Sequence, residues 1–298
     1  DDRVYCERYI ERPRHIEVQI LADGHGTCVH LWERECSIQR RFQKIVEETP
    51  SPGLTPELRE EICRAAVGIA TAAGYVNAGT VEFILAPDGA FYFLEMNTRL
   101  QVEHPVTEAV TGIDLVAAQV AIAGGAPMSF AQDDIGRMGH AIECRIYAED
   151  PDAGFVPATG KVLAFEPPEG PGIRFDGGLV VGQPVSAAFD PMLAKLIAHG
   201  ATREDALRRM RAALAQTVLL GVSTNISYLD RVLGHPEFAA GEIDTGALDR
   251  WAEDLAPPEP DGDDLAVVLA AATLNHRDFR DRARPLPAPH GAIGAWRN

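Results

Sequence analysis

Hydrophobic and polar side chains alternate along several stretches of the N-terminal half, a pattern that predicts β-strands with one face in the core. Turn-forming residues at 23–26 and 87–89 separate pairs of these stretches, which predicts antiparallel hairpins. The longest alternation runs from 91 to 105 and places polar groups at every second position of one strand face. These groups are Glu95, Asn97, Arg99, Gln101 and Glu103. A solvated strand face is the alternative interpretation.

Apolar residues also recur at helical spacing, after the first hairpin and again in the second half of the chain. Thr55 followed by Pro56 has the sequence of a helix start, because threonine caps free backbone N–H groups and proline fits the first helical position. The predicted helices cover 56–73, 114–124, 203–215, 224–233 and 265–274, the last after a proline-rich acidic linker. A strand pattern at 139–151 and short strands between glycine and proline turns complete an α+β fold.

Composition narrows the class of protein. The 298 residues are enough for two domains, and their net charge of −17 argues against nucleic-acid binding, which requires basic surfaces. We see neither a signal peptide nor an apolar run long enough to span a membrane, so we expect a cytoplasmic protein without a membrane partner. Five scattered cysteines without a CxxC motif predict buried free thiols.

Two carboxylates are predicted to share one face of the second hairpin. Glu82 lies in the strand 81–85 and would pair directly or diagonally with Glu95. Close like charges are costly unless a cation lies between them. Together with Asn97 these carboxylates offer hard oxygen ligands, which suit a Mg²⁺ ion that also holds phosphate. Glu103, further along the same face, is a candidate acid or base.

Groups suited to binding an anion accompany this site. Arg99 and Gln101 are hydrogen-bond donors on the same predicted strand face. Arg40, Arg41 and Lys44 form a basic cluster in an otherwise acidic chain, and such a cluster near a metal and phosphate suits anion binding. A charged surface loop is the alternative for this cluster.

At this point the sequence resembles a known family. Glu82 and the run EMNTRLQVEHP at 95–105 are similar to the metal and bicarbonate segment of biotin carboxylases, the ATP-grasp enzymes of biotin-dependent carboxylases. The resemblance runs from Asp1 to about Trp251, with several separated motifs in the family's order. It implies the C-terminal part of an ATP-grasp domain, an antiparallel sheet with helices, followed by a biotin carboxylase C-terminal domain. The implied ranges are 1–125 for the ATP-grasp part, 136–251 for the C-terminal domain, and 252–298 for a linker and helix leading to a further region.

The resemblance also implies the roles of individual residues. The residues matching the family's ATP site are Glu7, Arg8, Ile10, His15, Gln39, Ile84 and Leu94. Two Mg²⁺ or Mn²⁺ ions would be held by Glu82, Glu95 and Asn97. Bicarbonate would be bound by Lys44, Arg99, Gln101, Val102 and Glu103. Arg145 would face biotin carried on a partner domain, and Glu103, Arg99 and Arg145 would be the catalytic residues.

Some positions depart from the family pattern or have a simpler interpretation. Most relatives have lysine at Arg8 and many have histidine at Phe42, whose ring cannot donate a hydrogen bond to the nucleotide. His15 alone would more often be a structural strand histidine. Arg145 shares a predicted strand face with Glu143, so an ion pair between them is the alternative for that arginine.

The implied reaction is ATP-dependent carboxylation of biotin by bicarbonate through carboxyphosphate. Its partners would be a biotin carboxyl carrier domain and a carboxyltransferase subunit, and a homo-oligomer is compatible with the family. The family's N-terminal domain, two ATP-binding lysines and a glycine-rich lid would precede Asp1, so we expect a C-terminal fragment that is inactive by itself. Another ATP-grasp carboxylate–amine ligase and a non-catalytic assembly module are the alternatives. The final acyl-CoA acceptor is not encoded in these motifs.

Overall fold

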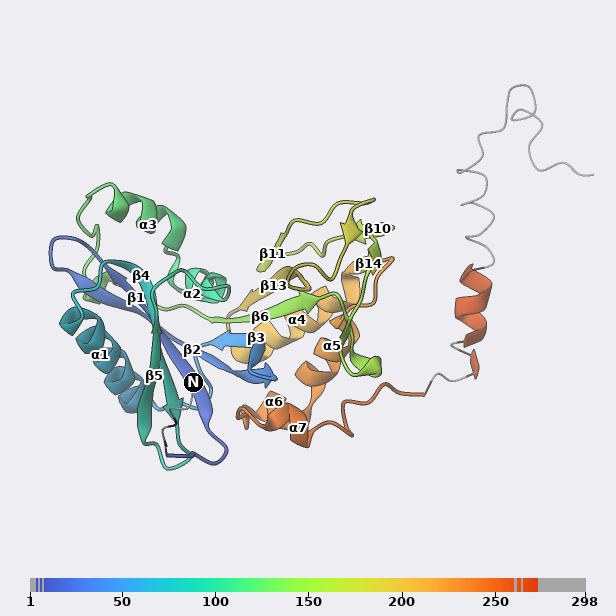
Figure 1. Cartoon of the computed structure of the whole chain (residues 1–298), viewed down its shortest axis with the longest axis horizontal. Coiled ribbons are helices and arrows are strands. Elements are labelled where there is room, and N and C mark those ends of the chain that lie inside the picture. The colour runs from blue at the N-terminus through green and yellow to red at the C-terminus, as the bar shows by residue number, and fades with distance from the viewer. Residues whose placement is uncertain (1–3, 5, 7, 260–261, 264, 273–298) are drawn as a thin grey trace, which may run out of the picture. The chain divides into compact units, whose positions relative to one another are not determined.

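The structure is a computed structural model that describes residues 4, 6, 8–259, 262–263 and 265–272 (Figure 1). Asp1–Ala256 form one compact unit and Pro257–Asn298 a second, in which the described residues include a helical stretch at 265–272. The end of the predicted helix 265–274 lies outside the described residues. The helices are α1 (Pro56–Ala72), α2 (His104–Thr111), α3 (Leu115–Ala123), α4 (Arg203–Gln216), α5 (Ile226–Gly234), α6 (Pro236–Ala240) and α7 (Ala247–Arg250).

One antiparallel sheet organises the larger unit, with eight strands in the order β11-β13-β6-β3-β2-β1-β4-β5. Its strands are β1 (Arg14–Ala22), β2 (Cys28–Arg40), β3 (Gln43–Thr49), β4 (Asn77–Leu85), β5 (Phe91–Asn97), β6 (His140–Tyr147), β11 (Ile173–Gly177) and β13 (Met192–Gly200). Short two-stranded ladders are formed by β7 (Glu149–Asp150), β8 (Val156–Pro157), β9 (Gly160–Lys161), β10 (Ala164–Glu166), β12 (Pro184–Val185) and β14 (Val218–Leu220). The α+β class predicted from the sequence is confirmed.

Strands from both predicted domains belong to this sheet. Pairing of β3 with β6 joins the part of the chain before residue 125 to the part after residue 136 (Figure 1). The division into an ATP-grasp portion and a C-terminal domain at these residues stays a prediction. What the pairing establishes is that side chains from both parts can meet at the middle of one sheet.

Helix α1 covers the sheet at β1, β2 and β4 and starts as the sequence predicts. The Thr55 hydroxyl accepts a hydrogen bond from the first turn, and Pro56 occupies the first position of the helix. Ile62 and Ala66 are fully buried in a core with Ile16 and other apolar residues of β1 and β4. Because α1 takes the apolar side chains on this face, the opposite face of these strands is left for polar groups.

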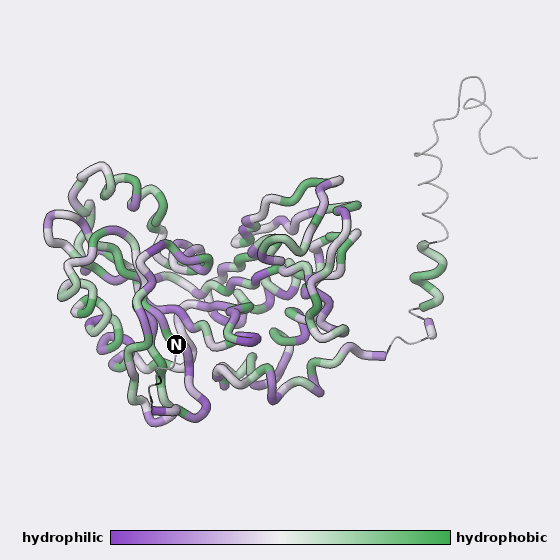
Figure 2. Tube along the Cα trace, in the orientation of Figure 1, coloured by the Kyte–Doolittle hydropathy of each residue, from purple (hydrophilic) through white to green (hydrophobic). Residues whose placement is uncertain are grey.

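A second core lies under α4 and α5, against β6 and β13. Leu196, Met210 and Leu229 are fully buried there, and Trp251 is 2% exposed. Hydrophilic residues also occur along the central strands of the sheet (Figure 2), and some of them, such as Glu17 and Glu47, are fully buried. The middle of the sheet is therefore the place where burial and charge meet.

The predicted strand at 91–105 is only half correct. β5 ends at Asn97, residues 98–102 form a loop, and α2 begins at His104 with Glu103 as the residue that precedes it. The predicted hairpin is confirmed, since Glu82 lies directly opposite Glu95 in the β4–β5 register. Alternation in the sequence therefore continued past the strand, because a loop and a helix start can carry polar side chains at every second position too.

The basic cluster at 40–44 lies on a strand hairpin, so the alternative of a surface loop is wrong for most of it. β2 runs to Arg40 and β3 starts at Gln43, which leaves only Arg41 and Phe42 in the turn. Both turn residues have positive φ, at 50° and 65°. A two-residue turn of this kind matches the twist of the flanking strands. The hairpin therefore turns the chain back so that β3, with Lys44 near its start, lies in the middle of the sheet between β2 and β6.

Cysteines and apolar helices add two further findings. Cys36, Cys63 and Cys144 are buried free thiols as predicted, whereas Cys28 is partly exposed and Cys6 exposed. Among the described residues no single helix is long and apolar enough to cross a membrane, although α2 and α3 together, bent by 98°, reach that length and composition.

Candidate active site

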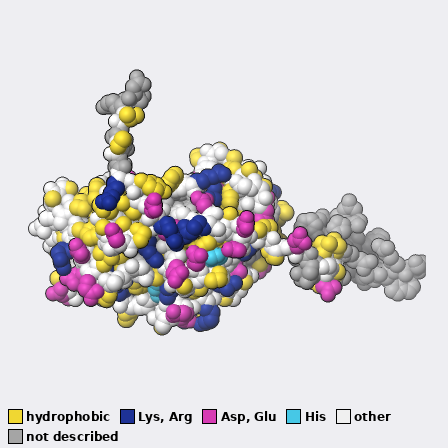
Figure 3. Space-filling model, turned by 90° about the horizontal axis from the view of Figure 1, so that it is seen from below, with side chains coloured by type: hydrophobic (Ala, Val, Ile, Leu, Met, Phe, Trp, Pro, Cys, Tyr) yellow, Lys and Arg dark blue, Asp and Glu magenta, His cyan; other side chains and the backbone are white. Residues whose placement is uncertain are grey.

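Every residue that the family resemblance assigns to the site and that the structure describes lines a single cleft of about 1070 Å³, whereas Arg40 and Arg41 of the basic cluster do not line it. These residues are Arg8, Ile10, His15, Gln39, Lys44, Glu82, Ile84, Leu94, Glu95, Asn97, Arg99, Gln101, Val102, Glu103 and Arg145. Glu7 lies outside the described residues. The face of the molecule shown in Figure 3 carries charges of both signs, with one group of Lys and Arg side chains near its middle.

Three glutamates stand in a row across neighbouring strands at the floor of this cleft. Glu17 on β1 is directly opposite Glu82 on β4, which is directly opposite Glu95 on β5. Residues opposite each other in adjacent strands project from the same face of the sheet. Glu17 and Glu82 are buried and Glu95 is exposed, so the row leads from the interior to the mouth of the cleft.

Lys44 supplies the cation that such a row requires. Its Nζ lies 2.5 Å from Glu17 Oε2, 2.9 Å from Glu82 Oε1 and 2.7 Å from Glu103 Oε1. Burial lowers the pKa of Lys44, but its carboxylate neighbours outweigh burial and hold that pKa well above its usual value. Burial likewise raises the pKa of Glu17, and Arg34 and Lys44 together reverse this and lower it to about 2. The Lys44 ammonium and the Glu17 carboxylate are therefore both charged at neutral pH.

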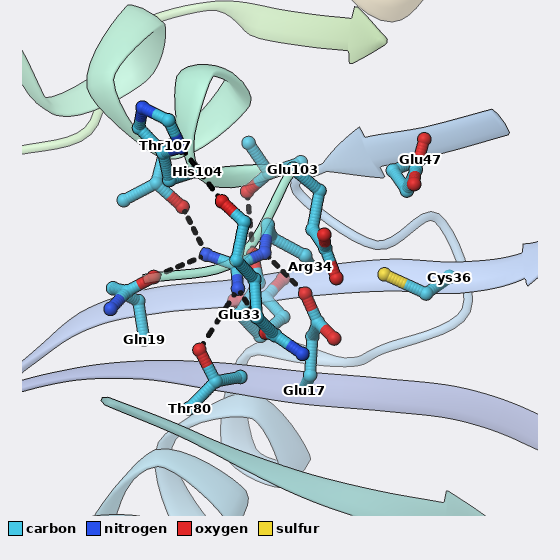
Figure 4. Close-up of polar contacts among 12 residues, drawn as sticks. Glu17, Gln19, Glu33, Arg34, Cys36, Glu47, Thr80, Glu103, His104 and Thr107 are labelled. Carbon is cyan, nitrogen blue, oxygen red and sulfur yellow. Dashed lines mark hydrogen bonds and ion pairs between the residues drawn. The ribbon is translucent and has the colours of Figure 1, made fainter. Parts of the chain in front are cut away.

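Arg34 is a second buried cation, and the sequence analysis missed it. The guanidinium is fully buried and donates to Glu17, to Gln19 Oε1 at 2.8 Å, and to Gln101 Oε1 at 3.1 Å (Figure 4). It also reaches Thr107 Oγ1 at 3.0 Å and Thr80 Oγ1 at 3.2 Å. Alternation did mark two of its partners, because Glu17 and Gln19 are polar positions between the apolar residues Ile16, Val18 and Ile20. Arg34 therefore ties β1, β2, β4, the loop and α2 together beneath the cleft.

The predicted metal ligands lie together at the mouth of the cleft. Asn97 Nδ2 donates to Glu82 Oε1 at 3.0 Å and to Glu95 Oε1 at 3.4 Å, so one amide separates two carboxyl groups. Burial raises the pKa of Glu82, but His15 and Lys44 outweigh it and hold that pKa below its usual range. Two carboxylates and an amide oxygen are hard ligands, and this donor set fits Mg²⁺ or Mn²⁺.

The loop after β5 presents donors on a fixed backbone. Gln101 Nε2 donates to Glu82 Oε1 at 2.9 Å, which orients its side chain. Lys195 Nζ donates to the Val102 carbonyl at 2.6 Å, which fixes the peptide on the other side. Arg99, in contrast, is exposed, and within the described part of the chain its side chain donates hydrogen bonds to the Leu100 carbonyl at 3.3 Å and to Asn97 Oδ1 at 3.5 Å. The loop thus combines two groups held by hydrogen bonds, the Gln101 side chain and the Val102 peptide, with the long exposed side chain of Arg99.

Glu103 joins this loop to Arg145 on β6. Its Oε2 accepts from Arg145 Nη2 at 2.9 Å while its Oε1 faces Lys44, and the side chain is 2% exposed. Arg145 Nε also donates to Glu47 Oε1 at 2.5 Å. The proposed alternative, an ion pair of Arg145 with Glu143, is not found among the described residues, since the ion pairs of Arg145 run to Glu47 and Glu103.

The residues matching the nucleotide site line the outer wall. His15 Nε2 lies 3.0 Å from Glu82 Oε2, and His15 Nδ1 lies 2.9 Å from Gln39 Nε2, so this histidine is not an isolated strand residue. Arg8 Nη1 reaches the Tyr92 hydroxyl at 3.3 Å. Apolar surface comes from Ile84, Leu94 and Phe93. A wall with apolar area and a few polar groups is suited to a flat heterocycle.

Phe42 lines the same cleft from the tip of the β2–β3 turn and is 96% exposed. Replacement of Phe42 by histidine is expected to improve nucleotide affinity by at most about tenfold, because one hydrogen bond contributes about 0.5–1.5 kcal/mol. Nucleotide titration of the full-length protein measures this. The neighbouring Arg41→His variant, at the same turn but outside the cleft lining, is the control. Weaker binding by Phe42→His would mean that the phenyl ring itself packs on the nucleotide.

Comparison with known proteins identifies two family models along the chain. Residues 1–131 match the model described as carbamoyl-phosphate synthase L chain, ATP binding domain, and residues 143–250 match the biotin carboxylase C-terminal domain. The α-subunit of a mitochondrial methylcrotonoyl-CoA carboxylase from Dictyostelium discoideum is 46% identical over 300 residues, covering 100% of this chain and 43% of that protein. A biotin carboxylase from a Nostoc strain is 50% identical over 242 residues, covering 81% of this chain and 54% of that protein.

Solved structures agree with these matches. The biotin carboxylase domain dimer of a 2-oxoglutarate carboxylase from Hydrogenobacter thermophilus, in complex with MgADP, ADP and bicarbonate, superposes with a TM-score of 0.83 at 45% identity. That match covers 85% of this chain and 56% of the other. The chain therefore spans about half the length of the curated relatives it matches. Its two matched models, its close relatives and its fold together show that the chain belongs to the biotin carboxylase family of ATP-grasp proteins.

Proposed function

We propose that this chain, within the full-length protein, takes part in the ATP-dependent carboxylation of carrier-bound biotin by bicarbonate. The observation that carries the proposal is Glu103, a buried carboxylate held between Lys44 and Arg145 at the meeting point of the two halves of the sheet. A solved relative was crystallised with MgADP and bicarbonate, which are the ligands that such a cleft would take. The carrier domain and a carboxyltransferase subunit are the proposed partners.

Bicarbonate would bind where the loop, Lys44 and Glu103 converge. Arg99 and Lys44 would neutralise its charge, and Gln101 with the Val102 N–H would orient its oxygens. Glu103 would then accept its proton, because a carboxylate within hydrogen-bond reach of a bound acid acts as a general base. The deprotonated oxygen could attack the γ-phosphorus of ATP, so that the new P–O bond of carboxyphosphate forms as the bond to the β-phosphate oxygen breaks and ADP leaves.

Glu82, Glu95 and Asn97 would hold the metal ions beside this position. A bound Mg²⁺ or Mn²⁺ ion supplies charge neutralisation and alignment of the phosphate chain. On the other side, Arg145 would bind the oxygen of biotin as negative charge develops on it, since a fixed cation stabilises an oxyanion more than the neutral group. Arg145 would have to exchange part of its contact with Glu103 or Glu47 for this ligand.

The proposed metal site leads to a test of Glu95. Replacement of Glu95 by glutamine in the full-length protein is expected to raise the Mg²⁺ concentration needed for half-maximal ATP cleavage by at least about tenfold, because losing a charged ligand costs no less than losing an outer-shell partner, which costs about ten- to a hundredfold. Titration with Mg²⁺ and with Mn²⁺ measures the shift. Glu60→Gln, an exposed carboxylate on α1 outside the cleft, is the control. An unchanged metal requirement would remove Glu95 from the ligand set.

The overall proposal is tested with the full-length protein by measuring ATP cleavage and carboxybiotin formation. Both are expected to require bicarbonate. ATP cleavage that depends on an amine acceptor, or no cleavage at all, would contradict the proposal in favour of the amine ligase or the assembly module. The curated relatives carry names of carboxylases with different acceptors, so the acyl acceptor is not part of the proposal.

The known relatives support the proposed homo-oligomer but not the expected cellular location of this protein. One relative is described as a domain dimer, which supports the proposal of a homo-oligomer. Several relatives are named mitochondrial or chloroplastic, so the cytoplasmic location expected from the sequence stays a prediction. The role of 252–298 as a linker to a further region also stays a prediction.

A further inference from the structure

Two buried carboxyl groups lie behind Arg145, and the proposed reaction uses neither of them directly. Glu47 on β3 and Glu143 on β6 are both 0% exposed. They are directly opposite each other in the β3–β6 register, so both side chains leave the same face of the sheet at neighbouring positions. Ionisation of both acids at such neighbouring buried positions is unfavourable, because like charges repel strongly where water is excluded.

The hydrogen bonds of the two acids are incomplete in a way that points to a proton. Glu47 Oε1 accepts from Arg145, but Glu47 Oε2 has no partner among the described residues. Neither carboxyl oxygen of Glu143 has one either. An ionised carboxylate can only accept hydrogen bonds, whereas a protonated carboxyl group also donates one. A proton on either acid would turn one of these three oxygens into a donor and provide a hydrogen bond to an oxygen of the other acid.

The charged groups around the pair are already engaged. Arg145, on the same strand as Glu143, donates to Glu47 and Glu103. Lys195, opposite Arg145 on β13, donates to the Val102 carbonyl. The remaining cation near the pair is Lys44, whose ammonium is held by Glu17, Glu82 and Glu103. The other titratable groups that interact with the pair are neutral in form: the thiol of Cys36, which lies near Glu47 (Figure 4), the thiol of Cys144 and the phenol of Tyr147, all with pKa values raised by burial. No described cation is therefore left to pair with Glu143.

The ionisation of the pair is displaced in the direction that this geometry requires. Burial raises the pKa of Glu47 to about 7, against the opposing effect of Arg145. Burial and the neighbouring Glu47 raise the pKa of Glu143 well above its usual value. Glu48, the next residue on β3, is equally buried but pairs with His140 and Arg203, and despite burial its pKa is lowered to about 2. Burial alone therefore does not explain why the pKa values of Glu143 and Glu48 shift in opposite directions. The difference is that Glu48 accepts hydrogen bonds from cationic partners, whereas Glu143 accepts none from any described residue.

We propose that Glu47 and Glu143 share one proton across the β3–β6 register and hold Arg145 with a single negative charge between them. Glu143 is then a positioning residue that acts on Arg145 through Glu47. With both acids ionised, Arg145 would be surrounded by three carboxylates, counting Glu103, and would be held in its present place. With the proton shared, Arg145 can release a contact and bind an incoming ligand oxygen. This last consequence rests on the proposed function, whereas the shared proton does not.

Infrared difference spectra between the wild type and each variant of the full-length protein at pH 7 test the shared proton. A protonated carboxyl group has a carbonyl-stretch band that an ionised carboxylate lacks. Glu143→Gln is expected to abolish one such band, and Glu47→Gln is expected to shift or abolish the same band. Glu48→Gln, the ionised control on the same strand, is expected to leave it unchanged. Identical spectra for wild type and Glu143→Gln would overturn the proposal. A band unaffected by Glu47→Gln would assign the proton to Glu143 alone and would also overturn sharing.

The effect on Arg145 is tested by the pH dependence of carboxybiotin formation. In the wild type this rate is expected to fall as the pair loses its proton on the alkaline side. Glu143→Gln mimics the protonated acid and is expected to remove that fall while ATP cleavage keeps its profile. An identical alkaline fall in Glu143→Gln would show that the pair does not control Arg145. If no variant and no wild type forms carboxybiotin, the proposed function fails, while the infrared result still decides the shared proton.

Discussion

Replacement of Glu103 by glutamine in the full-length protein is expected to lower bicarbonate-dependent ATP cleavage and biotin carboxylation together, by about a hundred- to ten-thousandfold. The reason is that a positioned general base contributes a factor of this size, and without it bicarbonate keeps its proton. Glu103 is 2% exposed, and its Oε1 lies 2.7 Å from Lys44 Nζ beside the proposed bicarbonate position. Phosphate release and carboxybiotin formation measure the two activities.

Arg145→Gln serves as the matched comparison, because this residue is proposed to act only after ATP has been cleaved. We expect carboxylation to fall by about a hundred- to a thousandfold, the effect of losing one oxyanion donor, with a smaller loss of ATP cleavage. Melting temperatures of both variants separate chemistry from folding. Equal losses of both activities with an earlier melt would mean that Arg145 only braces Glu47 and Glu103.

Replacement of Arg34 by methionine is expected to destabilise the protein by about 3–5 kcal/mol, because breaking a buried ion pair leaves an uncompensated buried charge. At about 2–4 °C per kcal/mol the melting temperature should fall by roughly 6–20 °C. Glu17 would keep only Lys44, and Gln101 would lose the donor that orients it. Arg64→Met is the control, since Arg64 and Glu60 form an exposed pair on α1 with side chains 70% and 73% exposed.

The same network predicts how acid affects stability. The pKa of Glu17 is lowered from 4.5 to about 2, so its ionised form stabilises the folded state above pH 4.5. That contribution is lost as the pH falls from 4.5 towards 2, because the unfolded state takes up the proton first. The Arg34→Met variant should lose less on acidification than the wild type. Unfolding midpoints of both proteins, measured between pH 4.5 and pH 2, test this difference. If both midpoints fell equally with pH, the role given to Arg34 would be contradicted.

The hairpin of β4 and β5 could be predicted from sequence because its information is local. A turn at 87–89 brings two alternating stretches together, and their register then follows from chain length. Alternation failed beyond Asn97 because it records which positions are polar, not whether the backbone is still extended. The loop at 98–102 and the start of α2 continue the pattern while changing direction.

Arg34, Glu47 and Glu143 were missed as parts of the site for a different reason. In a strand, a charged residue facing a buried polar network has the same spacing as one facing water. Burial of Glu47 and Glu143 depends on the pairing of β3 with β6, which follows about a hundred residues later in the chain. Burial of Arg34 depends on partners as distant as Thr80, Gln101 and Thr107. No local pattern contains these contacts, so their burial and their ionisation could not be predicted.

By itself the sequence determined the α+β class, the β4–β5 hairpin, the capped start of α1 and a set of site residues identified through family resemblance. These follow from short-range periodicity, turn chemistry and motif order, which are written within a few residues of each other. Only the tertiary structure decided that those residues meet in one cleft, that Lys44 and Arg34 hold the buried carboxylates, and that Glu143 lies opposite Glu47 without a cation. Charges in a protein interior take their state from neighbours that folding brings close, and those neighbours come from distant parts of the chain.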